Sequence, residues 1–157
     1  MKAKIANKKS IKIKAFNDTK LLRSAHKALG LSYSPYSHFA VGAAVLKSNG
    51  KIYLGANIEN ASYPLCLCAE RSAIAHAHSS APKSNILAIA VVAKSDSVKT
   101  SKAVSPCGAC RQVISEFEEK QKSPIRIILG NDEDTDRMTF SSIKDLLPYS
   151  FNSNYLV

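Results

Sequence analysis

The sequence predicts an α/β fold, a three-layer α-β-α sandwich with a mixed β-sheet. Segments with helical spacing and segments of strand character follow one another along the chain, which is the pattern of such folds. Two continuous apolar runs, residues 86–93 and 125–129, have strand length and are typical of strands buried on both faces. Asn49-Gly50 lies between two further apolar segments and favours a tight hairpin.

The first half of the chain is expected to form a helix, a hairpin and a loop. Asn17 is a suitable helix cap, apolar residues recur at helical spacing between positions 21 and 29, and Gly30 is expected to end the helix. Residues 39–46 and 51–56 are predicted to be the two strands of the hairpin. Residues 57–64 are then expected to form a polar loop.

The second half repeats helices and strands. A helix is expected over about 67–79, followed by the buried strand 86–93 and a polar loop over 94–106. A second helix is expected from 107 to about 120, followed by the strand 125–129. A short strand near 138–140 and a helical candidate over 143–147 precede the final segment.

Composition favours one domain over residues 16–157, preceded by a Lys-rich extension over residues 1–15. The formal charge is +10, but six lysines precede the first acidic residue, Asp18, and leave only +4 for the rest. We interpret the extension as a solvated end, with weak contact to anionic polymers as the alternative. The chain lacks an apolar run near the ~20 residues that cross a bilayer, and its start lacks a secretory apolar region. We therefore expect a cytoplasmic protein without membrane contact.

Two cysteine-containing fragments carry the chemistry: Cys68-Ala69-Glu70 and Pro106-Cys107-Gly108-Ala109-Cys110. Each opens a predicted helix, where the positive end of the dipole favours the thiolate that binds zinc. Cys107 and Cys110 share one helical face, and Cys68 can supply a third ligand if the two helix starts converge. Three protein ligands leave the fourth position of one Zn²⁺ ion open for water, which is the arrangement of a catalytic site.

The residues after Cys68 suit catalysis at such a metal. Glu70 is close enough in sequence to reach a zinc-bound water without being a ligand, and it could move protons between the water and a substrate. Three thiolates give a zinc site a net negative charge, so we expect Arg71 to compensate by donating hydrogen bonds to the sulfurs. This pair of fragments resembles the known signature of zinc-dependent nucleobase deaminases.

A closed structural site is the main alternative for the cysteines. Cys66 could complete a four-cysteine zinc site without catalysis, and Glu70 would then be an ordinary first-turn carboxylate. We prefer the open site, with Cys66 as a small buried apolar residue. One free thiol in the native zinc protein would support the open site, and none would support the closed one.

Several motifs in order resemble the cytidine deaminase family over roughly residues 18–151. They are Ser34-Pro35-Tyr36-Ser37-His38-Phe39-Ala40-Val41-Gly42, Asn57-Ile58-Glu59-Asn60-Ala61, Cys68-Ala69-Glu70-Arg71 and Ser105-Pro106-Cys107-Gly108-Ala109-Cys110-Arg111-Gln112. The resemblance implies that Asn57 and Glu59 hold the ribose hydroxyl, that Phe39 lies against the base and that the backbone of Ala69 reads the pyrimidine edge. The short, single-zinc form of the family is similar in length and is a homotetramer with shared active sites. Tyr63 and Phe151 fall where that form places residues shared between subunits.

The resemblance implies a hydrolytic deaminase that converts cytidine and 2′-deoxycytidine to uridine and 2′-deoxyuridine in pyrimidine salvage. A deaminase of nucleoside-like antibiotics or of nucleic-acid cytosine is the alternative. The charge gives the nucleic-acid alternative little support, because it clusters outside the matching region. Three positions depart from the family pattern: Cys66, Ala56 and the bulky Tyr149 before Phe151.

Overall fold

The computed structural model describes residues 17–156, so the predicted Lys-rich extension of residues 1–15 lies outside the described residues. The sheet has five strands in the order β2-β1-β3-β4-β5. Only the β3–β4 pair is parallel within the described sheet, so the sheet is mixed, as predicted. The strands are β1 (Phe39–Lys47), β2 (Ile52–Ala56), β3 (Ile86–Ser95), β4 (Arg126–Asn131) and β5 (Arg137–Phe140).

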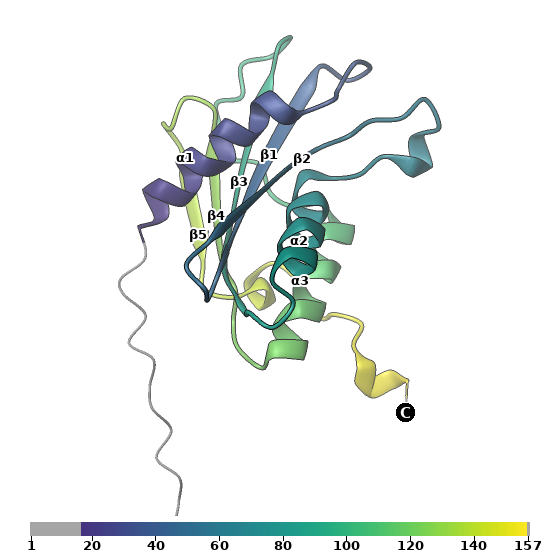
Figure 1. The fold of residues 1–157 in the computed structure, drawn as a ribbon. Helices are drawn as coiled ribbons and strands as arrows, with labels where there is room; N and C mark the ends of the chain where they lie inside the picture. The colour runs from purple at the N-terminus through teal and green to yellow at the C-terminus, as the bar shows by residue number, and fades with distance from the viewer. Residues whose placement is uncertain (1–16, 157) are drawn as a thin grey trace, which may run out of the picture.

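Helices cover both faces of this sheet, which confirms the three-layer architecture (Figure 1). Helix α1 (Asp18–Ala28) lies on one face, while α2 (Ala69–Ser80) and α3 (Gly108–Gln121) lie together on the other. Each face has its own apolar core, one beneath α1 and the other beneath α2 and α3. Within residues 17–156, every helix falls short of the length and apolar character needed to cross a membrane.

The strands supply both cores because successive side chains point to opposite faces. Val45 and Ile89 pack beneath α2 and α3, whereas Ala44 and Ala90 pack beneath α1. With both faces covered, an internal strand needs apolar side chains at almost every position. This requirement explains the continuous apolar run of β3, which is buried from Ala88 to Ala93.

Two glycines allow helices to approach the sheet closely. A Cβ atom at Gly55 in β2 would lie 2.2 Å from the backbone nitrogen of Ala73 in α2. A Cβ atom at Gly42 in β1 would lie 2.2 Å from the backbone oxygen of Ala25 in α1. A side chain at Gly55 would therefore displace α2, whose first turn carries part of the candidate site.

The elements agree with the sequence prediction at most ends and differ at four places. Asn17 caps α1 as expected, with its Oδ1 accepting a hydrogen bond from the backbone N–H of Lys20 at 3.2 Å. Gly30 does not end the helix in a left-handed conformation; the chain continues through it in a 3₁₀ turn, Leu29–Leu31. The candidate helix over 143–147 is only a 3₁₀ turn, Ile143–Asp145, and two further 3₁₀ turns, Tyr63–Leu65 and Ser153–Tyr155, were not predicted.

Candidate active site

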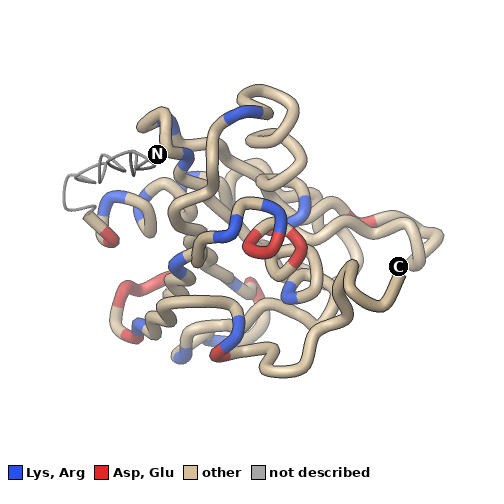
Figure 2. Tube along the Cα trace, turned by 90° about the horizontal axis from the view of Figure 1, so that it is seen from below, with Lys and Arg blue, Asp and Glu red and all other residues tan. Residues whose placement is uncertain are grey.

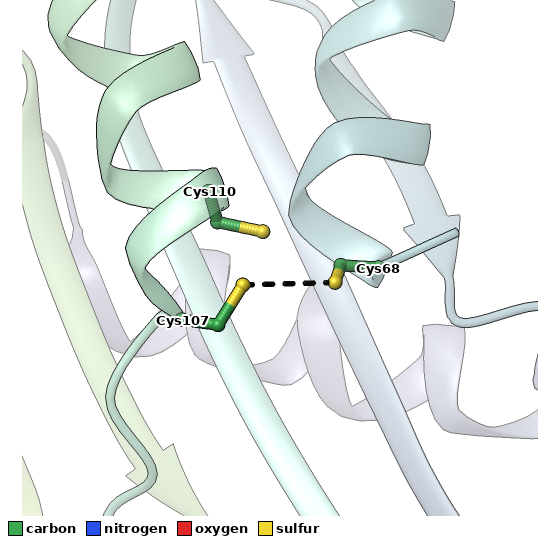
Figure 3. A group of neighbouring side chains, drawn as sticks. All are labelled: Cys68, Cys107 and Cys110. Carbon is green, nitrogen blue, oxygen red and sulfur yellow. Dashed lines mark hydrogen bonds between the residues drawn. The ribbon is translucent and has the colours of Figure 1, made fainter. Parts of the chain in front are cut away.

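Three cysteine sulfurs converge between the first turns of α2 and α3 (Figure 3). Cys68 is the N-cap residue of α2, Cys107 is the N-cap residue of α3, and Cys110 lies in the first turn of α3, fully buried. The three sulfurs lie within 4.8 Å of one another, and the Sγ atoms of Cys68 and Cys107 are 3.8 Å apart. The two helix starts thus bring together the three cysteines that the sequence singled out.

The spacing of these sulfurs fits a tetrahedral zinc ion. Zinc–sulfur bonds of about 2.3 Å place two ligand sulfurs about 3.8 Å apart in a tetrahedron. The separation between Cys68 and Cys107 matches that value. Within residues 17–156, no further histidine, cysteine or acidic side chain joins the cluster. Three soft donors without a fourth protein ligand are the donor set of an open zinc site.

The electrostatics of the cluster favour a bound cation. Burial raises the pKa of the Cys110 thiol, and the nearby charges of Glu70 and Cys68 raise it further. Burial also raises the pKa of the Cys68 thiol. Burial alone would raise the pKa of Cys107 as well, but hydrogen bonds from Cys110 lower it overall. Three thiolates therefore repel one another here unless a cation joins them, and a dication stabilises the deprotonated set.

Glu70 lies in the first turn of α2, beside the cluster but outside it. Its residue is only 5% exposed, so the carboxyl group is largely removed from solvent. Burial raises the pKa of this carboxyl group, while a hydrogen bond to its own backbone and the charge of Arg71 act in the opposite direction. The structure thus places a shielded carboxyl group near three metal-binding sulfurs without using it as a ligand.

A pocket of about 280 Å³ opens at the cluster. The predicted site residues that line it are Cys68, Cys107, Glu70, Ala69, Asn57 and Glu59. Its volume is near the lower limit for small-molecule sites, which suits a small metabolite. A larger groove of about 560 Å³ lies between the end of α3 and the C-terminal segment, but no cluster of metal-binding side chains among the described residues opens on it. Chemistry, and not size, therefore locates the candidate site.

Asn57 follows β2 and is fixed by hydrogen bonds to the neighbouring strand. Its Oδ1 accepts from the backbone N–H of Val41 at 2.8 Å and from the hydroxyl of Ser32 at 2.6 Å. Its Nδ2 donates to the backbone oxygen of Phe39 at 2.9 Å. Asn57 therefore links the loop after β2 to β1 and also lines the pocket.

Glu59 accepts hydrogen bonds from the loop that precedes β1. Its Oε2 accepts from the backbone N–H groups of Tyr36 at 3.0 Å and Ser37 at 3.2 Å, and its Oε1 accepts from the Ser37 hydroxyl. The hydrogen bond from Ser37 is the main reason that the pKa of Glu59 lies below its ordinary value. The Ser37 hydroxyl also accepts from the backbone N–H of Phe39 at 3.1 Å, so one serine connects two predicted substrate-binding residues.

Three of the predicted substrate-binding residues lie outside the lining of this pocket. Phe39 is half-buried at the start of β1, and its backbone oxygen accepts a hydrogen bond from Asn57. Tyr63 is 71% exposed and packs edge-on against Tyr36 at 6.2 Å between ring centroids. Phe151 is 58% exposed in the C-terminal segment that runs beside α3, where its backbone oxygen accepts from Gln112.

Cys66 and Arg71 differ in part from the sequence expectations. Cys66 is not a member of the sulfur cluster within the described residues, so the arrangement does not support a closed four-cysteine site. It is only partly buried, which corrects the expectation of a buried residue: its sulfur accepts from the backbone N–H of Asn60 at 3.3 Å, and the residue lines the pocket. Arg71 is near enough to Glu70 to influence its pKa, but no hydrogen bond joins it to a sulfur in the described structure.

The sequence missed several residues that shape the site. Apolar side chains of Val41, Leu67, Val91 and Val104 line the pocket, together with Ser105. Arg111 holds the loop before α3, because its Nε donates to the backbone oxygen of Pro106 at 2.8 Å and one terminal nitrogen donates to the Ser105 hydroxyl at 3.1 Å. Ser105 and Arg111 lie directly beside the cysteine motif in the sequence. This proximity was the only sequence signal that could have identified them as site residues.

Charged residues are dispersed over the described body and do not mark a second kind of site. Figure 2 shows Lys and Arg at scattered positions along the trace, with Asp and Glu interspersed among them. A groove for a nucleic-acid strand would need a continuous basic surface. The distribution within residues 17–156 offers no particular support for a polyanionic substrate.

The fold and the site together define a three-layer α/β protein with an open, three-cysteine metal centre. A family model described as the cytidine and deoxycytidylate deaminase zinc-binding region matches residues 16–123, which include all three clustered cysteines and Glu70. The chain therefore belongs to the cytidine and deoxycytidylate deaminase family, and its cofactor is zinc.

Individual relatives agree with this assignment. The cytidine deaminase of Halalkalibacterium halodurans is 43% identical over 134 residues, which cover 85% of this chain and 92% of that protein. The probable cytidine deaminase of Dictyostelium discoideum is 39% identical over 139 residues, covering 88% of this chain and 86% of that protein. The crystal structure of cytidine deaminase from Burkholderia pseudomallei superposes with a TM-score of 0.74 at 39% identity, covering 87% of this chain and 100% of that one. The predicted fold class is confirmed.

Proposed function

We propose that this protein is a cytidine deaminase, which hydrolyses cytidine and 2′-deoxycytidine to uridine and 2′-deoxyuridine and releases ammonia. One observation carries the proposal: two of the three clustered cysteines, Glu70 and the polar pair Asn57 and Glu59 all line a single pocket. The names of the relatives supply the substrate class. Such a reaction would return pyrimidine nucleosides to nucleotide synthesis.

The chemistry is divided between the metal and one carboxyl group. Zinc held by Cys68, Cys107 and Cys110 would supply an activated water as the nucleophile. Glu70 would take a proton from that water, deliver a proton to the ring nitrogen and assist the departure of ammonia. Its position outside the ligand cluster leaves it available for this transfer, and its burial keeps bulk water away from it.

The remaining site residues would hold the nucleoside. We assign the sugar hydroxyl to Asn57 and Glu59, because an amide donor and a carboxylate acceptor together match a group that both donates and accepts. The backbone of Ala69 would read the pyrimidine edge beside the metal. Phe39 would contact the base from the start of β1, where its backbone oxygen accepts a hydrogen bond from Asn57.

Arg71 is proposed to balance the negative charge of three thiolates on zinc. Its influence on the pKa of Glu70 is consistent with a position near the metal centre. We expect Arg71→Gln to lower turnover or zinc affinity. Unchanged turnover and unchanged zinc affinity in this variant would show that Arg71 does not have this role.

We further propose a cytoplasmic homotetramer with shared active sites. Tyr63 and Phe151 are aromatic and exposed in the single chain, which suits residues that complete the pocket of a neighbouring subunit. Light scattering coupled to gel filtration should give four times the mass of one chain. Phe151→Ala should then reduce activity although the residue lies outside its own chain's pocket.

The decisive experiment is an ammonia-release assay on zinc-loaded protein with cytidine, deoxycytidine, cytosine and deoxycytidine monophosphate. We expect efficient turnover of the two nucleosides, with zinc near one equivalent per chain. Preference for the free base or the monophosphate would contradict the sugar assignment. Turnover of a nucleoside-like antibiotic alone would favour the alternative that the sequence left open.

A further inference from the structure

Lys47, the last residue of β1, is a lysine in a core position. It is only 1% exposed. Among the described residues, it is the largest by volume of those with a fully buried side chain. The register between β1 and β3 shifts between Leu46 and Lys47, which places Lys47 opposite Ile86. Ala43 and Val45 belong to the core beneath α2 and α3, so strand alternation directs Lys47 toward the same side of the sheet, and the register shift brings Ile86 of that core opposite it.

The buried lysine borders a small pocket of about 100 Å³. His78 near the end of α2, Lys120 near the end of α3, and Ser84 and Asn85 from the loop before β3 also line it. No aspartate or glutamate lines it among the described residues. Cationic and hydrogen-bonding groups thus form one part of its wall, and the apolar Pro82 and Phe117 form another.

The ammonium group of Lys47 lacks a counter-charge in the described structure. Within residues 17–156, it has neither an ion pair nor a side-chain hydrogen bond. Among the described residues, no fully enclosed polar side-chain atom lacks a partner, so the Lys47 nitrogen must keep a narrow contact with the solvent in the pocket. Burial, and then the charge of Lys120, lower the pKa of Lys47. An ammonium group in this setting is costly unless an anion joins it.

The neighbouring groups are held in place around the opening. Lys120 lies over the ring of Phe117, with its Nζ 5.8 Å from the ring centroid. His78 packs edge-on against the same ring at 5.6 Å between centroids. One aromatic side chain therefore orders two basic side chains beside Lys47.

We propose that this pocket, bounded by Lys47, His78, Ser84, Asn85 and Lys120, binds a small oxyanion of the phosphate class. Its volume equals that of about three water molecules in the liquid, which accommodates an inorganic oxyanion or the terminal phosphate of a larger molecule and is too small to enclose a whole nucleotide. His78 follows Cys68 by ten residues, which corresponds to about 15 Å along a helix. The anion site is therefore separate from the zinc site and does not depend on the proposed activity.

The test is calorimetric titration of the zinc-loaded protein with inorganic phosphate at constant ionic strength, together with amide NMR shifts of Ser84 and Asn85. We expect saturable binding and shifts at both amides. Lys47→Met, which keeps an apolar chain of similar length, should weaken binding by about tenfold or more. Lys120→Gln should weaken it by several-fold, and the exposed Lys51→Gln should change it by less than about twofold.

The alternative is that these cations only compensate the partial negative charge at the carboxyl ends of α2 and α3. In that case phosphate would leave the Ser84 and Asn85 amides unshifted in the wild-type protein, and the proposal would be wrong. Equal phosphate affinity in wild type and Lys47→Met would also overturn it, because that binding would occur elsewhere. Should Lys47→Met fail to fold, Lys120→Gln gives the same comparison from the exposed side of the pocket.

Discussion

The sulfur of Cys68 lies 3.8 Å from the sulfur of Cys107, across a sequence separation of 39 residues. Each cysteine is the N-cap of its helix, so this contact joins the starts of α2 and α3. Neither side chain caps its helix by a hydrogen bond, which leaves both sulfurs available to a metal. The positive ends of two helix dipoles meet at the same point and favour thiolates there. The packing of two helices on one sheet therefore determines the metal site as much as the cysteines do.

Replacing one of these sulfurs should remove the metal. We expect Cys107→Ala to lose stoichiometric zinc and to melt at a lower temperature, because metal binding and folding are coupled. Metal analysis after gel filtration and a thermal melt measure the two effects. Zinc that stays at one equivalent per chain would rule out the three-cysteine ligand set.

Cys66 provides the matched control, since it is the remaining cysteine and its sulfur contacts Asn60 instead of the cluster. Cys66→Ser should retain zinc at the wild-type level. A thiol-reactive reagent should count one free thiol per chain in the native zinc protein. A count of zero would indicate that Cys66 is also bound.

Glu70→Gln tests the proton transfer separately from the metal. The amide has the same shape and Glu70 is outside the ligand cluster, so the variant should fold and hold zinc. Its kcat for cytidine should fall by about 10²–10⁴-fold, which is the usual contribution of a positioned general acid–base. Near wild-type turnover with zinc in place would exclude Glu70 as the proton carrier. Glu116→Gln, which changes an exposed glutamate on α3, should leave kcat unchanged.

The fold and the metal cluster were accessible from the sequence because both depend on local patterns. The apolar run in β3 and the Asn49-Gly50 turn indicate their structures without tertiary information, and Gly50 does adopt a positive φ of 80°. Cys107 and Cys110 are three residues apart at the start of one helix, and Cys68 begins the other helix. The convergence of two helix starts was then the single tertiary assumption, and the geometry satisfies it.

Other features depend on packing that no local pattern reveals. Lys47 lies just before the Asn49-Gly50 turn in the sequence, yet it continues the inward-facing row of Val45 and is buried beside the ends of two helices. Glu118 looks like a surface residue of α3, but it is buried and accepts from the backbone N–H groups of Ile125 at 2.7 Å and Ile143 at 3.0 Å. Such contacts form between separate elements of the fold, so only the tertiary structure shows which residues make them.

The ionisation of Glu59 should depend on Ser37. Hydrogen bonds from the Ser37 hydroxyl and from two backbone N–H groups hold the pKa of Glu59 below the ordinary value of 4.5. A depressed folded-state pKa stabilises the protein above pH 4.5, and this stabilisation is lost as the pH falls through the folded value. The side-chain ¹³C titration of Glu59 should therefore have its midpoint below pH 4.5.

Ser37→Ala should move that midpoint upward, toward 4.5, because the main hydrogen bond to the carboxylate is removed. Ser34→Ala serves as the control, since the Ser34 hydroxyl bonds to Ser32 and not to Glu59. An unchanged midpoint in Ser37→Ala would show that the backbone donors alone set the ionisation.

Asn57 should prove to have a structural role and a binding role that can be separated. Asn57→Ala leaves the Val41 N–H and the Phe39 carbonyl without their partner, so the free energy of unfolding should fall by about 1–3 kcal/mol. Ser32→Ala removes a single hydrogen bond to Asn57 and should cost about 1 kcal/mol. Chemical denaturation of the zinc-loaded variants measures both losses.

The binding role rests on the second N–H of the Asn57 amide. A side-chain amide has two N–H groups, and the contact with Phe39 uses one of them. The other can donate to a sugar hydroxyl while the acceptor side of Asn57 stays locked to β1. Asn57→Asp keeps that acceptor and removes the donors, so KM for cytidine should rise by about tenfold or more with a smaller change in kcat. Ser32→Ala should leave KM within about twofold. If Asn57→Asp loses stability while KM stays at the wild-type value, Asn57 only supports the fold, and another residue must hold the sugar.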